Sequence, residues 1–380
     1  MAVHSNRSNL ALFLLFFVLG CINPIELEVR TDDRLLVVDG FITTEPGPHK
    51  IRLTRSSDYI GFSFQSGVNV AEENALVAIR SDQGEVFRMA HIGRGIYQTP
   101  TDFQPVIGQS YSLNIELMNG DQLVSAPQLI TEAPAIENVL LRYNKLPSVD
   151  EFSFNSGVDV FVEYQDPAAS RNFYLTTHTK GVYPFTSNWD LFFCGNNPFC
   201  CVPTFANPEL ERCFRYERDF PDTGVQVESV QDCRRSGGPQ ERQFNVYEDS
   251  QFNGNLITNK AVFIKDDGRR FEFSYRTQIN LMSISPEAFA FFSAIQGQLS
   301  IDGDIFDPPP ANVRGNMLNL TNPNQQVLGY FGAFDVSSET IYIERDLLED
   351  FQSQFLWTTD CVNLDSSSVE KPLDWQGSSW

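Results

Sequence analysis

The sequence predicts a mainly β protein: an N-terminal immunoglobulin-like β-sandwich, then a larger β-rich domain with one short helix and a disulfide-rich insertion. Three observations predict this. Apolar and polar residues alternate along many short runs, as in half-buried strands. Turn residues separate these runs roughly every 8 to 12 residues, the spacing of small sandwich domains. Five of the seven cysteines gather in one segment without periodicity, residues 183–240.

The first twenty residues have the features of a secretory signal. Arg7 supplies a positive charge, and residues 10–19 form an apolar core that is too short to span a bilayer. The end, Val18-Leu19-Gly20-Cys21, resembles a bacterial lipobox, in which the cysteine thiol receives a diacylglycerol. We expect 1–20 to be a lipoprotein signal peptide, Cys21 to be acylated, and 21–32 to be a tether. In the alternative, Cys21 is an ordinary cysteine near a cleavage site.

The chain is strongly acidic, with 49 Asp and Glu residues against 27 Lys and Arg and a formal charge of −22. Removing residues 1–20 takes away Arg7 and no acidic residue, so the mature chain would carry −23. The sequence has no basic stripe of the kind that binds nucleic acid. Docking on anionic lipid through charge is also disfavoured. The simplest interpretation is that the acidic surface keeps the protein soluble outside the cytoplasm.

The predicted sandwich, 33–133, consists of about seven short strands. In one of them Ile51 and Leu53 alternate with polar residues, and residues 74–90 form two strands about a turn at Gly84. A later strand directs four apolar side chains one way: Tyr111, Leu113, Ile115 and Leu117. Asn119-Gly120 then supplies the positive φ angles of a tight hairpin.

The second domain is expected at 134–360, with a boundary near Ala133-Pro134. Alternating strands recur at 137–145, 157–167 and 260–285, with a hairpin predicted at Asp267-Gly268. Ser285 and Pro286 predict the N-cap and first residue of a helix over 285–299. Its apolar residues follow at three- and four-residue steps: Phe289, Phe292, Ile295 and Leu299. Residues 361–380 are expected to be a loose tail.

Six cysteines remain in the mature chain, and export implies an oxidising compartment, so we expect disulfides. The pairing stays open, although the adjacent Cys200 and Cys201 would bond to two different partners because a bridge between neighbours is strained. A zinc site is the alternative, but the spacings contain no Cys-x-x-Cys and no nearby histidine. The disulfide candidates are Cys194, Cys200, Cys201, Cys213, Cys233 and Cys361.

The insertion at 183–240 is rich in aromatic residues. Loops held on a rigid scaffold often carry function, and aromatic side chains are frequent interface anchors. The binding candidates are Trp189, Phe192, Phe193 and Phe199. In the alternative interpretation, these side chains form a satellite core pinned by the disulfides.

We find no catalytic motif in the sequence and expect no cofactor. His49, His91 and His178 are far apart and share no pattern, so we assign no catalytic residues. The segment 301–312 offers Asp302, Asp304 and Asp307 as weak calcium candidates. It lacks the glycine and the final acid of an EF-hand, and a turn stiffened by three prolines, 308–310, is the simpler interpretation.

Five segments together resemble the domain-of-unknown-function family 4249, and the resemblance covers nearly the whole mature chain. They are LVVDGFITTEPGPHKIRLTRSSDY, FNGNLI, SISPEAFAFF, GDIFDPPPANVRGN and LGYFGA. The resemblance implies an outer-membrane lipoprotein of Gram-negative bacteria, commonly encoded beside a TonB-dependent receptor. It implies no catalytic residues. The family usually ends with a second cysteine and a glycine-rich tail, whereas here Cys361 stands alone, which leaves its pairing open.

These observations predict a non-enzymatic binding or accessory lipoprotein of a TonB-dependent nutrient uptake system, lipid-anchored in the outer membrane on its cell-surface or periplasmic face. The expected partners are the receptor and, through the acyl chains, the membrane. The ligand is not indicated. A surface hydrolase of glycan or peptide and a structural or adhesive surface lipoprotein are the alternatives.

Overall fold

The computed structural model describes residues 34–56, 70–146, 155–187, 192–193, 202–203, 211–216, 244–299, 313–350, 367–368 and 372–377, without residues 169, 251 and 269. Contacts divide the chain into two compact units. The first comprises Met1–Arg34 and Ser57–Val68, and the second comprises Leu35–Ser56 and Asn69–Trp380. All elements below belong to the second unit.

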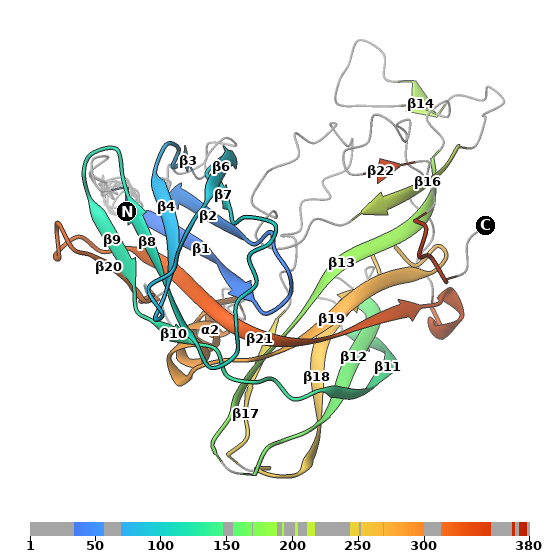
Figure 1. Ribbon diagram of the computed structural model, residues 1–380. Coiled ribbons are helices and arrows are strands. Elements are labelled where there is room, and N and C mark those ends of the chain that lie inside the picture. The colour runs from blue at the N-terminus through green and yellow to red at the C-terminus, as the bar shows by residue number, and fades with distance from the viewer. Residues whose placement is uncertain are drawn as a thin grey trace, which may run out of the picture. The chain divides into compact units, whose positions relative to one another are not determined.

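The described chain is mainly β with one short α-helix, as predicted (Figure 1). The first ten strands are β1 (Leu36–Thr43), β2 (Lys50–Arg55), β3 (Val70–Ala71), β4 (Leu76–Ser81), β5 (Val86–Arg88), β6 (Ala90–Gly93), β7 (Ile96–Gln98), β8 (Ser110–Glu116), β9 (Gln122–Ser125) and β10 (Gln128–Leu129). The next are β11 (Ile136–Leu146), β12 (Asn155–Gln165), β13 (Phe173–Ser187), β14 (Phe192–Phe193), β15 (Val202–Pro203), β16 (Glu211–Tyr216) and β17 (Asn245–Glu248). The last elements are β18 (Leu256–Lys265), β19 (Tyr275–Ser283), α2 (Pro286–Leu299), β20 (Met317–Asn319), β21 (Leu328–Ile343), the 3-10 helix η3 (Arg345–Leu347) and β22 (Ser367–Ser368).

The largest sheet in the described chain runs in the order β22-β16-β13-β19-β21-β1-β2-β7-β6, with β17 paired to β13 and β3 to β2. A second sheet runs β20-β9-β8-β4-β5, with β10 on β8. The strands β11-β12-β18 form a third sheet, and β14 pairs with β15.

Strand β21 connects the two ends of the sequence. Its first half pairs in parallel with β1, from Val37↔Leu328 to Thr43↔Phe334. Its second half pairs antiparallel with β19, from Asp335 to Ile343. Strand β20 likewise joins β9. Strands from the two sides of the predicted domain boundary near residue 133 are therefore hydrogen-bonded to each other. The boundary itself stays a prediction.

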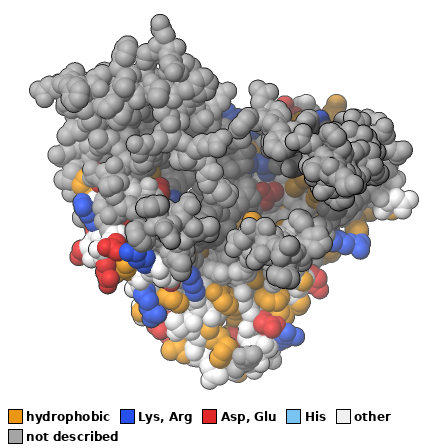
Figure 2. Space-filling model, turned by 180° about the vertical axis from the view of Figure 1, so that it is seen from behind, with side chains coloured by type: hydrophobic (Ala, Val, Ile, Leu, Met, Phe, Trp, Pro, Cys, Tyr) orange, Lys and Arg blue, Asp and Glu red, His pale blue; other side chains and the backbone are white. Residues whose placement is uncertain are grey.

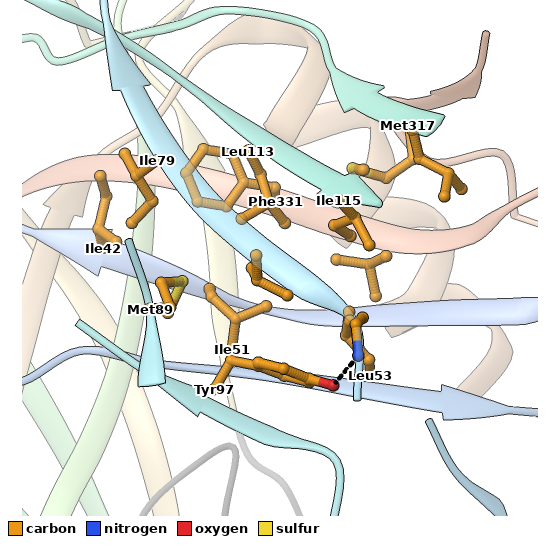
Figure 3. Packing of buried hydrophobic residues seen from close by; sticks show 14 of the residues in the cluster. Ile42, Ile51, Leu53, Ile79, Met89, Tyr97, Leu113, Ile115, Met317 and Phe331 are labelled. Atoms are coloured by element: carbon orange, nitrogen blue, oxygen red, sulfur yellow. Dashed lines mark hydrogen bonds between the residues drawn. The ribbon is translucent and has the colours of Figure 1, made fainter. Parts of the chain in front are cut away.

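The first core lies between the two sheets that contain β1 and β8 (Figure 3). The predicted alternation in β8 is confirmed: Tyr111, Leu113, Ile115 and Leu117 are all buried in this core. The hairpin at Asn119-Gly120 is also confirmed, with Gly120 at φ 88° between β8 and β9. Phe331 of β21 enters the same core (Figure 3).

Strand β2 departs from the predicted half-buried pattern. Ile51 and Leu53 enter the first core, but Arg52 and Thr54 on the other face are buried as well. Asp39 of β1 is the cross-strand partner of Arg52, so an opposite charge lies beside the guanidinium.

The second core lies between the β11-β12-β18 sheet and the strands β13 and β19. The predicted hairpin at Asp267-Gly268 is wrong, although a turn forms there with Gly268 at φ 76°. Strand β18 pairs with β12, whereas β19 pairs with β13 and β21. The connection crosses between sheets, and its Phe271 side chain is fully buried in the core that both sheets share.

The helix begins as the sequence predicts. Ser285 Oγ accepts a hydrogen bond from Ala288 N at 3.1 Å, the N-cap interaction that satisfies a free amide of the first turn. Phe289 packs on Phe173 with ring centroids 5.0 Å apart. Leu299, expected on the same apolar stripe, is exposed.

The described part of the C-terminal tail is packed rather than loose. Trp375 is buried against Val182 and Tyr342. Asp374 Oδ1 lies 2.8 Å from Arg276 Nη1 of β19, and this ion pair with the guanidinium holds the pKa of the Asp374 carboxyl below its usual range. A single tryptophan can thus fix a short polar segment that has no periodicity of its own.

Candidate functional site

Most predicted site residues lie outside the described ranges. This holds for Cys21, Cys194, Cys200, Cys201, Cys233 and Cys361, for Trp189 and Phe199, and for Asp302, Asp304 and Asp307. The backbone of Cys213 lies in β16, opposite Phe185. Phe192 and Phe193 form β14, opposite Pro203 and Val202. Acylation, disulfide pairing and ligand binding at these positions therefore stay predictions.

The three histidines occupy separate environments. His49 lies edge-on to Phe103, with ring centroids 5.9 Å apart, and burial lowers its pKa. His91 stacks on Tyr97 at 4.9 Å. His178 lies in β13 opposite Ile279 of β19. None of these contacts brings two of the histidines together.

An open pocket of about 330 Å³ lies where the start of β11 meets β21. Glu137 and Glu339 line it, with Ile136, Asn138, Val139 and Ile341. Ile136 N donates to Ser337 Oγ at 2.9 Å, which holds the two strands together. Asn138 Nδ2 is engaged by Glu163 Oε2 at 2.9 Å. Both pocket glutamates are exposed, so water screens their charge.

A polar network crosses one face of β13, β19 and β21. Gln278 Nε2 donates to Glu45 Oε1 and to Asn280 Oδ1, each at 3.0 Å. Asn280 Nδ2 donates in turn to Thr179 Oγ1 at 3.0 Å. Ser338 Oγ lies 3.2 Å from Glu45 Oε1. These hydrogen bonds connect the segment after β1 to β19 and β21. The network therefore stabilises the large sheet.

Two buried aspartates hold together the loops after β12 and β17. Asp166 accepts hydrogen bonds from Gly254 N at 2.9 Å and from Tyr174 Oη. Asp249 Oδ2 accepts from Asn172 N at 2.9 Å. Gly254 belongs to the FNGNLI segment. The sequence signals for this arrangement are weak, because an acid at a strand end is ordinarily solvated.

Three tyrosines lie in the strands beside these loops, and burial raises the pKa of each: Tyr164, Tyr174 and Tyr247. For Tyr247 the pKa rises to about 12, and its hydroxyl donates to Lys260 O. The folded state holds this proton more tightly than the unfolded state does. The contribution of the protonated Tyr247 hydroxyl to the free energy of unfolding is therefore complete below pH 10. It is lost as the pH rises toward 12, because the unfolded state loses this proton first.

We expect the free energy of unfolding to fall between pH 9 and pH 11.5, and to fall less in Tyr247→Phe. The fall in the free energy of unfolding should be about 1 kcal/mol larger in the native protein than in the variant, after allowing for the partial exposure of this side chain. Urea titrations at both pH values measure it. An identical fall in the two proteins would contradict this role for Tyr247.

Within the described ranges, no three His, Cys, Asp or Glu side chains converge as metal ligands would. Among the helices of those ranges, none has the length and apolar character to cross a bilayer. The described geometry thus offers an open pocket lined by two exposed glutamates and two structural polar clusters.

Comparison with known proteins gives one positive result. The family model described as "Domain of unknown function (DUF4249)" matches residues 22–340, which is most of the chain. Searches of curated proteins and of solved structures return no match. The matched region includes Gly120, Gly254 and Gly268, the helix cap at Ser285 and the loops after β12 and β17. The chain belongs to the DUF4249 family.

Proposed function

We propose that this protein is a lipoprotein of the outer membrane, anchored through acyl chains on Cys21, that acts as a binding or accessory component of a TonB-dependent nutrient uptake system. The observation that carries the proposal is Val18-Leu19-Gly20-Cys21 at the end of a short apolar run. Acyl chains contribute about 0.8 kcal/mol per buried methylene, so several of them would hold the protein firmly on a membrane. The place beside an uptake channel is what the resemblance given in the sequence analysis implies, and this part of the proposal rests on that resemblance alone.

Two features favour binding over catalysis. The pocket at Glu137 and Glu339 is open to water, whereas acid catalysis by paired carboxylates relies on a protected environment. The polar network around Asn280 uses its donors and acceptors within the protein, and such groups serve architecture. A binding role requires a stably folded protein with a surface that a partner can contact, and it requires no catalytic groups.

The proposal includes a finer architecture. Residues 33–133 form an immunoglobulin-like sandwich, supported by the core that the β1 and β8 sheets share. The insertion at 183–240 is stapled by disulfides and presents Trp189, Phe192, Phe193 and Phe199 to a partner. Its support is the sequence: aromatic residues and cysteines concentrate in one segment.

Cys21→Ser should abolish acylation and release the protein from the membrane. Metabolic labelling with an alkyne fatty acid, followed by fractionation, measures both. We expect label only in the native protein and at least a tenfold rise of the variant in the soluble fraction. Gly20→Ala keeps a small residue before the cysteine and is the matched control, which should label normally. A native protein that takes up no label would refute the anchor.

The partner is tested by purifying the native protein from detergent-solubilised outer membranes. A TonB-dependent receptor should be recovered with it and should be depleted when Cys21→Ser is the bait. Mass spectrometry on cells grown with different nutrients would then indicate the transported compound. Repeated recovery of the protein without any β-barrel receptor would count against the uptake role while leaving the anchor intact.

A further inference from the structure

Five exposed apolar side chains occupy the end of the structure at which β1 starts. We call this group the tether-end patch. The exposed fractions of these side chains range from 45% to 77%. The patch consists of Val70, Leu76, Met118, Leu318 and Leu320.

Strand pairing places these residues at one end of both sheets. In the large sheet, Arg55 pairs with Leu36 at the start of β1 and with Val70 of β3. The chain then passes directly from β3 to Leu76 at the start of β4. Figure 1 shows the starts of β1 and β21 and the end of β20 on the same side of the molecule.

The second sheet completes the patch. Leu76 pairs with Glu116, at the β8 end that leads into the turn containing Met118. Leu320 N donates to Gln122 O across the same end at 2.7 Å. Leu318 points away from the core, because its neighbours Met317 and Asn319 are buried and side chains alternate along a strand. The leucines of this edge therefore face outward as a consequence of register.

Charges of both signs lie near the patch, including the exposed Arg34 shortly before β1 and the exposed Arg314, which forms a β-bridge with Leu328. Glu73 and Glu116 are exposed, and Glu72 Oε2 lies 2.6 Å from Arg55 Nε. These mixed charges favour neither an anionic nor a cationic surface, whereas a neutral lipid surface would accept the apolar side chains. Figure 2 shows that hydrophobic side chains elsewhere are mingled with charges, on the lower part of the rear face.

We propose that the tether-end patch rests on the neutral lipid surface beside the acyl chains of Cys21. This inference depends on the proposed anchor. Residues 22–35 separate Cys21 from β1. A segment of this length spans at most about 50 Å, so it can keep the patch within reach of the bilayer. Tethering raises the local concentration of lipid enough for a weak apolar contact to be populated.

A second apolar group serves as an internal comparison. Val106, Ile107 and Leu129 are similarly exposed at the opposite end of the same sheet, where Leu129 pairs with Ser110 at the start of β8. This group lies away from the start of β1. If the tether-end patch becomes buried on a lipid surface while Val106, Ile107 and Leu129 stay exposed, the protein docks through one defined end. Burial of both groups would indicate general adhesion.

Met118 supplies the probe, because it is exposed while Met89, Met282 and Met317 are buried. The mature chain, with a hexahistidine in place of Cys21, is held on phosphatidylcholine vesicles containing a nickel-chelating lipid. Flotation verifies the tether, independently of acylation in cells. Peroxide oxidation of Met118, measured by mass spectrometry, should be about fivefold slower on vesicles than in solution.

Two variants sharpen the test. A methionine introduced by Leu129→Met should oxidise at the same rate on vesicles and in solution. Leu318→Gln combined with Leu320→Gln should reduce the protection of Met118 to less than twofold, with an unchanged circular dichroism spectrum. Both substitutions lie on exposed side chains, so folding is preserved.

An unprotected Met118 on protein that floats with the vesicles would overturn the proposal without touching the anchor. Equal protection at position 129 would overturn it as well, because it would show non-specific adhesion. Protection found only in isolated outer membranes, and absent on vesicles, would assign the patch to a membrane protein instead of lipid.

Discussion

Gly329→Ala should prevent the protein from folding, or cost more than about 4 kcal/mol of stability. Gly329 has φ 87°, and a Cβ there would lie 1.8 Å from Val38 O of β1. A Cβ on Gly315 would in turn lie 1.5 Å from Gly329 O. Three backbone segments meet at this point without room for a methyl group, and backbone atoms cannot rotate away as side chains do. Both glycines lie in segments that carry the family resemblance.

Gly120→Ala is the matched control for this prediction. Gly120 has nearly the same φ, 88°, but a Cβ there meets nothing within 4 Å. It should cost only the backbone strain of about 1–2 kcal/mol. Urea denaturation of the two variants, with soluble yield as a second readout, measures the difference. Similar losses in both would show that the crowding between β1 and β21 is not what requires glycine.

Asp166→Ala should cost about 3 kcal/mol of the free energy of unfolding. The carboxylate is buried, and its removal leaves Gly254 N and Tyr174 Oη without their acceptor in a water-excluded place. Each unsatisfied buried donor costs about 1–3 kcal/mol. The loops after β12 and β17 would then lose the bond that closes them, and hydrogen exchange at Gly254 should accelerate.

Asp82→Ala is the control for the aspartate prediction. Asp82 Oδ2 also accepts a backbone hydrogen bond, from Ser110 N at 3.2 Å, but the group is exposed. Water replaces the lost acceptor there, so the cost should stay below about 1 kcal/mol. Chemical denaturation at pH 7 compares the two. If Asp166→Ala were as mild as Asp82→Ala, the loop pair would not be closed by a buried carboxylate.

Part of the candidate site could not be anticipated because its members are distant in sequence. The pocket joins Glu137 to Glu339, and the loop pair joins Asp166 to Gly254. A lone glutamate or aspartate among polar neighbours has no local pattern that distinguishes a buried or convergent position from a solvated one. Only the pairing of strands brings these carboxylates to their partners.

The sequence by itself determined the local structure: the alternation in β8, the hairpin at Gly120, the cap at Ser285 and the mainly β class. Adjacent residues set these features, because side-chain period and turn angles depend on near neighbours. The tertiary structure alone decided that β21 lies between β1 and β19, that β18 and β19 belong to different sheets, and that Trp375 is buried. Backbone hydrogen bonds can join almost any two strands, so the choice of partner depends on which distant apolar faces fit together.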